Sequence, residues 1–316
     1  MREKLIEKNI YEKEKGLNVK VRSFYFRHAE KASGAVGSAK TGEISKSAIS
    51  PRGRSESLQL GIQAPEFSEQ TDIGWSGNIR TLETIKGLIE GGQVDGVDFK
   101  AQERIELSEK LMPKDWIRLY VAKWDANKAK ILAEMGISKK RYPLLSTSEQ
   151  AEIAETAEEP VIAEWLDNQN SELAKLYPSE TAAAHMAVLV KEDIEKPANL
   201  ESGSKLDQLR GTHKTITEPL LMKILRLENG QKPQKLEDIG DCLSLNDGFE
   251  IDSSIDEKGE KSLKFTMYRA VKTEPGEGIT FIKKEFGVDL DELNRLADLG
   301  VKLEKEREQK SDDKKV

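Results

Sequence analysis

Segments with the pattern of β-strands alternate with segments that have the spacing of helices along much of this sequence. The first strand candidate, residues 17–26 (LNVKVRSFYF), is rich in β-branched and aromatic residues. Residues 78–92 (NIRTLETIKGLIEGG) have apolar side chains three and four positions apart, which is typical of an amphipathic helix. Strands that alternate with helices indicate an α/β fold. The sequence therefore predicts a three-layer α/β/α fold with a mostly parallel sheet.

One long helical block interrupts this alternation. From about residue 115 to residue 197 nearly every segment has helical spacing. That is too much chain for one crossover between neighbouring strands, so we interpret it as a helical insertion packed over one end of the sheet. We predict a charged lead-in over residues 1–16, a main domain over 17–275 that contains the insertion, and a helical, charged tail over 276–316.

The composition limits the partners that charge alone could attract. Charged residues make up 34% of the 316 residues, and the formal net charge is −7. A mildly acidic chain has no general attraction to nucleic acid or to anionic membranes, so any anion site must be a local cluster of cations. Residues 1–16 are charged throughout and contain no apolar h-region, so we do not expect them to be a secretory signal. The sequence contains no run of roughly 18 apolar residues and has one cysteine, Cys242. We expect a cytoplasmic protein without nucleic-acid or membrane partners, and leave its oligomeric state open.

Basic side chains follow three predicted strands at the same end. Arg27 and His28 come directly after the first strand. Arg80 lies in the first turn of a predicted helix, and His213 follows the strand candidate KLDQLRG. If these strands are parallel neighbours, the side chains converge where open α/β sheets bind ligands. Arginines and imidazoles there suit a phosphoryl group, because protein cations can neutralise its charge without a metal ion. We see no Cys/His metal spacing and no P-loop.

Five short motifs, taken in order, resemble those of the histidine phosphatase superfamily over about residues 18–270. RHAEK is similar to the family's Arg-His-Gly-Glu motif, with Ala29 in place of Gly. ISPRGRSESLQLG, SGNIRTLETI, IELSEKL and GTHKTITEPLLMKIL are similar to the segments that follow it. Each of them stands in the strand, loop or helix setting that the family gives it. The resemblance implies a phosphoglycerate mutase-like fold.

The resemblance also implies a role for each matching residue. His28 matches the nucleophile, which would form a phosphohistidine intermediate. Glu109 matches the acid that protonates the leaving group and later activates water, with Glu106 in the same segment as the alternative. Three residues match the phosphate pocket: Arg27, Arg80 and His213. The resemblance implies neither a cofactor nor a metal ion.

Two departures from the family pattern bear on the function. Lys214 follows His213, where one branch of the family has a carboxyl donor, so the acid must come from the region of Glu109. The loop over residues 31–49 lacks the Asn that mutase members place there. We predict a metal-independent phosphomonoester hydrolase that acts on a phosphorylated small molecule or a phosphoprotein. A phosphoglycerate-type mutase and an inactive phosphatase fold that serves as an interaction module are the alternatives.

Overall fold

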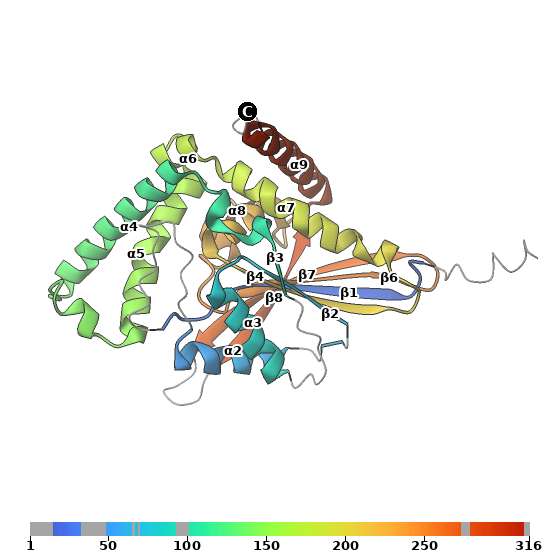
Figure 1. The fold of residues 1–316 in the computed structure, drawn as a ribbon, viewed down its shortest axis with the longest axis horizontal. Coiled ribbons are helices and arrows are strands. Elements are labelled where there is room, and N and C mark those ends of the chain that lie inside the picture. Colours follow the sequence, from blue (N-terminus) through green and yellow to red (C-terminus); the bar gives the residue numbers. More distant parts are fainter. Residues whose placement is uncertain are drawn as a thin grey trace, which may run out of the picture.

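The computed structural model describes residues 15–32, 49–64, 67–68, 70–92, 101–272 and 279–312 (Figure 1). The predicted lead-in and the loop over 31–49 lie almost entirely outside these residues, as does the very end of the predicted tail. The described strands are β1 (Val19–Arg27), β2 (Thr71–Trp75), β3 (Ala101–Glu103), β4 (Lys205–Thr212), β5 (Leu225–Arg226), β6 (Gly248–Ile255), β7 (Lys261–Lys272) and β8 (Ile279–Val288).

Helices cover both faces of the sheet that these strands form (Figure 1). The α-helices are α2 (Pro51–Gln63), α3 (Ile79–Gly91), α4 (Lys114–Glu134), α5 (Thr147–Asp167), α6 (Glu172–Leu176), α7 (Ser179–Glu195), α8 (Lys214–Ile224) and α9 (Leu290–Asp312). The short 3-10 helices are η2 (Ile105–Leu107), η3 (Glu109–Leu111), η4 (Tyr142–Leu144), η5 (Lys196–Asn199) and η6 (Leu236–Ile239).

The eight strands form one mixed sheet in the order β3-β2-β4-β1-β6-β7-β8-β5. β3, β2, β4 and β1 are parallel neighbours. The remaining pairs, from β1–β6 to β8–β5, are antiparallel. The predicted α/β fold is therefore confirmed, and the predicted parallel arrangement makes up one half of the sheet. The other half is an antiparallel meander, which needs no helical crossovers.

β1 lies in the middle of the sheet and is covered on both faces. Phe24 and Phe26 belong to an apolar cluster with Leu60 of α2 and Leu88 of α3. Tyr25 belongs to a second cluster, which includes residues of α7, α8 and α9. Because successive side chains of a strand point to opposite faces, a strand buried on both faces needs large apolar residues in succession. This requirement explains the run of aromatic residues at the end of the first predicted strand.

The helical block between β3 and β4 has two parts. α4 and α5 form a hairpin that projects beyond the sheet, whereas α7 runs along the sheet and packs against α8 and α9 (Figure 1). Aromatic rings join the base of the hairpin to the core, since Trp116 of α4 lies 4.8 Å from Tyr120 and 4.8 Å from Trp165 of α5, measured between ring centroids. This packing holds α5 beside the carboxyl ends of the parallel strands.

The prediction of a helical tail over residues 276–316 is wrong in its first part. Ile279–Val288 forms β8, which pairs with β7 in the main sheet. Ile279 and Phe281 are buried, but the rest of β8 is largely exposed and includes the charged run from Lys283 to Glu285. These charges hide the two-residue alternation by which a strand is found in a sequence. α9 follows as a helix and packs into the core.

Candidate active site

The strand order brings four sequence motifs to one edge of the sheet. Because β3, β2, β4 and β1 are parallel neighbours, their carboxyl ends lie in a row. The segments that follow these strands carry, in the same order, Glu109, Arg80, His213 and the pair Arg27–His28. All five residues named from the sequence are thus at this edge. Their side chains differ in how many hydrogen bonds they already make within the protein.

His28 and His213 lie against each other because β1 and β4 are in register. Arg27 at the end of β1 is opposite Thr212 at the end of β4, so a histidine follows on each side. The two ring centroids are 5.1 Å apart, and the ring planes meet at 64°. His28 is 6% exposed and His213 is 4% exposed. The two imidazoles are therefore buried side by side.

The hydrogen bond at His28 Nδ1 determines which ring nitrogen can react. Nδ1 lies 2.9 Å from the carbonyl oxygen of Ala29. A carbonyl can only accept, so Nδ1 carries the proton of the neutral ring and Nε2 keeps a lone pair. Burial holds the pKa of His28 well below its usual value, and the cation of Arg80 lowers it further. At neutral pH His28 is therefore an uncharged imidazole with the lone pair that a nucleophile needs.

His213 is held by Ser76 and is also uncharged at neutral pH. Its Nε2 lies 2.8 Å from the Ser76 hydroxyl oxygen. Burial lowers the pKa of His213 to about 4, while the Glu109 carboxylate acts to raise it and Arg80 acts to lower it. A dianion placed beside this ring favours its protonated form. His213 can therefore take up a proton and donate to an oxyanion when one is bound.

The Arg80 guanidinium is a cation at the same edge, and its hydrogen-bond donors are not used by the described residues. Within the described part of the chain, no side chain or carbonyl accepts a hydrogen bond from it, and its buried Nε has no partner. Asn78 caps α3 by accepting a hydrogen bond of 3.1 Å from the Arg80 backbone N–H, which fixes the first turn. A buried donor without an acceptor costs free energy. An oxyanion would supply the missing acceptor.

Two contacts fasten the loop that follows β1. The Ala29 N–H donates to Thr84 Oγ1 of α3 over 2.9 Å. The Ser50 hydroxyl, at the N-cap of α2, donates to the Glu30 carboxylate over 2.7 Å. Gly53 is needed at this point, because a Cβ there would lie 2.6 Å from the Glu30 carbonyl oxygen. The glycine of the second motif thus allows α2 to approach the loop closely.

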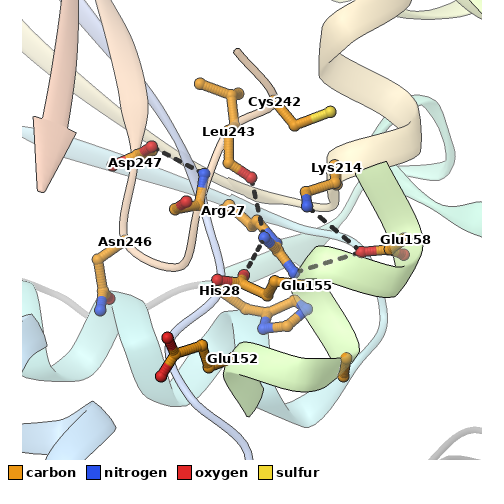
Figure 2. Close-up of polar contacts among 12 residues, drawn as sticks. Arg27, His28, Glu152, Glu155, Glu158, Lys214, Cys242, Leu243, Asn246 and Asp247 are labelled. Atoms are coloured by element: carbon orange, nitrogen blue, oxygen red, sulfur yellow. Dashed lines mark hydrogen bonds and ion pairs between the residues drawn. The ribbon is translucent and has the colours of Figure 1, made fainter. Parts of the chain in front are cut away.

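Arg27 differs from Arg80 because its guanidinium is already bonded within the protein (Figure 2). Nη1 donates to Glu155 Oε1 over 2.6 Å and to the Leu243 carbonyl oxygen over 2.8 Å. Nη2 lies 3.8 Å from Glu158 Oε2, and the buried Nε has no partner. Arg27 is therefore located at the predicted site, but two carboxylates of α5 accompany it, and the sequence did not indicate them.

Glu158 is the centre of a buried network that joins α5 to the sheet. It accepts a hydrogen bond of 2.7 Å from Tyr120 Oη, and its Oε2 lies 3.4 Å from Lys214 Nζ. Burial acts to raise the pKa of Glu158, but Lys214, Arg27 and the hydrogen bonds together bring it below its usual value. Lys214 is 3% exposed and serves as a counter-ion of Glu158.

A sequence signal for Glu158 does exist. Ala157, Val161 and Ile162 are on the buried stripe of α5, and Glu158 lies between them on the same side. A carboxylate on the apolar side of an amphipathic helix needs a cation or a hydrogen-bond donor when it is buried. This pattern marks Glu158 as paired, but it does not say which of the many cations is the partner.

The structure separates the two candidate acids. Arg104 Nη2 donates to Glu106 Oε1 over 3.2 Å, so Glu106 is engaged outside the pocket. Glu109 is exposed, and its charge acts to raise the pKa values of both His213 and Arg80. Of the two carboxylates, Glu109 is therefore the one that acts on the cationic edge.

Other features lie away from this edge. A hollow of about 330 Å³ is lined by Lys20, Lys205 and Asp207 among others, at the opposite end of β1 and β4. It is separated from the histidines by the length of the strands. Among the residues that the structure describes, no three His, Cys, Asp or Glu side chains are grouped to hold a metal ion, and no described helix is long and apolar enough to cross a membrane.

Comparison with known proteins gives structural likeness only. No protein-family model and no curated protein sequence matches the chain. A phosphoglycerate mutase from Bacillus anthracis is similar at 14% identity and a TM-score of 0.40, covering 78% of this chain and 92% of that chain. The apo form of Hafnia alvei phytase gives 11% identity and a TM-score of 0.47 over 90% and 96%. A mycobacterial glucosyl-3-phosphoglycerate phosphatase gives 12% and 0.37 over 77% and 97%. Likeness at this level is a likeness of fold and says nothing about activity.

Proposed function

We propose that the protein is a phosphomonoester hydrolase of the histidine phosphatase superfamily and that His28 is its nucleophile. The observation that supports this most is the state of His28, a buried neutral imidazole with Nδ1–H held by the Ala29 carbonyl and Nε2 unprotonated. It is 5.1 Å from the His213 ring. The guanidinium of Arg80, whose Nε has no partner among the described residues, acts on the pKa of both rings. These features support a proposal in which His28 is the nucleophile, His213 is a donor and Arg80 is a cation for the phosphoryl group.

The reaction that we propose has two steps. Nε2 of His28 attacks phosphorus, the ester P–O bond breaks, and the leaving oxygen takes a proton from the Glu109 carboxyl group. Water, deprotonated by the same carboxylate, then attacks the phosphohistidine and releases inorganic phosphate. Arg80 and a protonated His213 would stabilise the oxygens on phosphorus in both steps. These cations supply the charge neutralisation that a metal ion supplies elsewhere, so we propose metal-independent turnover.

We propose a class of substrate. It is a phosphorylated small molecule or a phosphoprotein, hydrolysed in the cytoplasm, and neither nucleic acid nor a membrane is part of the proposal. The acidic helix α5 beside the site and the net charge of −7 give no reason to expect a polyanionic partner.

A panel of phosphate monoesters assayed with EDTA present tests this function. We expect phosphate release from at least one ester, and a loss of roughly 10³-fold or more in kcat for His28→Ala, because the variant removes the covalent route. The fold of the variant can be verified by its thermal unfolding. Activity that disappears with EDTA and returns with Mg²⁺, or full turnover by His28→Ala, would refute the proposal.

A further inference from the structure

The Nη1 group of Arg27 has no N–H left for a ligand. It has two N–H bonds, and one goes to Glu155 Oε1 (2.6 Å) while the other goes to the Leu243 carbonyl oxygen (2.8 Å) (Figure 2). The Arg27 side chain is 8% exposed, and its buried Nε has no acceptor within the described residues. Within the described residues, Nη1 therefore uses both of its N–H bonds, whereas the N–H of Nε has no acceptor.

The protein's own charges balance at this edge of the sheet. The cations Arg27, Arg80 and Lys214 face carboxylates: Glu155 and Glu158 lie near Arg27, Glu158 also lies near Lys214, and Glu109 acts on Arg80. Three cations are thus matched by three carboxylates, and Glu155 is the one bonded directly to Arg27. A phosphoryl dianion that binds Arg27 would add two negative charges beside the carboxylates of Glu155 and Glu158. Like charges at hydrogen-bonding distance repel strongly in a poorly solvated pocket, so one of them has to leave.

Glu155 is the Arg27 partner that can leave most easily. The Leu243 carbonyl belongs to a backbone segment whose own N–H donates to Glu218 Oε1 over 2.9 Å. Glu158 is held by Tyr120 as well as by Lys214. The Glu155 side chain is 22% exposed, and among the described residues Arg27 is the one partner found for its carboxylate. It can turn into water without leaving another cation unpaired.

We propose that Glu155 is an internal competitor for the phosphoryl group, released from Arg27 when a phosphate ester binds. Glu155 is thereby an affinity-determining residue of the site, set on the inserted helix rather than on the sheet. This inference rests on the proposed function, because it takes the Arg27 edge as the phosphate site. It predicts that Glu155 raises KM for phosphate esters and leaves the chemical step nearly unchanged, since a competitor that has already left does not act on the transition state.

The test is the binding of tungstate, a phosphate-like oxyanion, measured by titration calorimetry. Glu155→Gln keeps the size and an acceptor oxygen but removes the charge, and Glu152→Gln is the matched control one turn earlier on α5, where the side chain is exposed. We expect Glu155→Gln to lower the dissociation constant of tungstate by about 10-fold or more. A change of this size corresponds to the free energy of one charge-assisted hydrogen bond. Glu152→Gln should stay within about twofold of the wild type.

A wild-type measurement keeps the inference testable even if Glu155→Gln fails to fold. In crystals of the wild type grown with tungstate, the anion should contact Arg27, and Glu155 Oε1 should no longer be within hydrogen-bonding distance of Nη1. An anion on Arg27 with the Glu155 bond intact overturns the inference. So does unchanged or weaker tungstate binding by a folded Glu155→Gln, and so does equal tightening by both variants, which would be a general charge effect of α5.

The two proposals can fail separately. If wild type and Glu155→Gln bind tungstate equally and phosphate esters are hydrolysed, only the competitor role is lost. If neither protein binds tungstate at this edge, the phosphate site itself is wrong and both proposals are lost. A lower KM with unchanged kcat for Glu155→Gln, on any ester that the wild type hydrolyses, supports both.

Discussion

Burial, more than any single charge, sets the protonation of the two histidines. It is the largest influence lowering the pKa of both His28 and His213. For His28 this keeps a lone pair on Nε2 at neutral pH, and the Ala29 carbonyl selects that nitrogen rather than Nδ1. Burial likewise keeps His213 neutral at neutral pH. The same residue type can therefore serve as a nucleophile and as a donor a few ångströms apart, because the local partners differ.

The acid assigned to Glu109 can be tested by the dependence on the leaving group. Glu109→Gln should lower kcat on alkyl phosphates by about 10²- to 10⁴-fold, because their leaving oxygen needs a proton as the P–O bond breaks. On p-nitrophenyl phosphate the loss should be far smaller. Steady-state kinetics on both substrates measures this. Glu106→Gln is the control, since Glu106 is bonded to Arg104. If Glu106→Gln shows the dependence and Glu109→Gln does not, the acid is misassigned.

At the scale of the elements, a buried ion network fastens α7 to the parallel strands beneath the site. Arg210 of β4 donates to Asp193 of α7 over 3.0 Å and to Asp72 over 2.9 Å. Tyr25 of β1 donates to the same Asp193 over 2.5 Å. Asp193 is 0% exposed and Arg210 is 1% exposed. The network therefore fixes the two strands whose ends carry the histidines.

Removing Asp193 should be strongly destabilising, because the buried Arg210 cation would then keep only Asp72, a partly exposed carboxylate, as its ion-pair partner. We expect Asp193→Ala to lower the free energy of unfolding by about 3–5 kcal/mol. Urea unfolding measures it. The matched control is Asp298→Ala on α9, whose pair with Lys191 spans 3.9 Å and whose side chain is 80% exposed; it should change stability by less than about 0.5 kcal/mol. Equal losses in both variants would argue against the network.

The sequence was sufficient for the elements that carry regular patterns. The aromatic run of β1 and the amphipathic spacing of α3 each had one physical explanation, and the structure agrees with both. β8 was missed because most of it is exposed and its charged residues interrupt the alternation of apolar and polar side chains. Glu155 was missed for another reason. Its partner Arg27 is 128 residues away, and no local pattern states which long-range pair of opposite charges will form.

For the molecule as a whole, the buried titrating groups give opposite pH dependences of stability. His28 and His213 have lowered pKa values in the folded state, so the unfolded chain takes up more protons as the pH falls below 6.5 and stability is lost on acidification. Glu218 is the reverse case, because burial raises its pKa from 4.5 to about 7. Its contribution is fully present at low pH and is lost as the pH rises through 7.

Glu218→Gln isolates the second of these effects. The amide cannot ionise, so the variant should gain stability relative to the wild type as the pH rises. From pH 5.5 to 8.5 the difference in the free energy of unfolding should move in favour of the variant by about 2 kcal/mol, at about 1.4 kcal/mol for each pH unit below 7. Urea unfolding at both pH values measures this change. A difference between variant and wild type that stays constant with pH would show that Glu218 does not titrate there.

The central claim is that His28 Nε2 becomes covalently phosphorylated, and a quenched single-turnover reaction tests it most directly. The wild type is mixed with a radiolabelled phosphate ester that it hydrolyses, stopped with alkali after milliseconds, and freed of small molecules. We expect up to one phosphate per chain, stable to base, labile to acid and located on the peptide that contains His28. His28→Ala should retain none. Turnover by the wild type without such an adduct, or an adduct that persists in His28→Ala, would contradict the assignment.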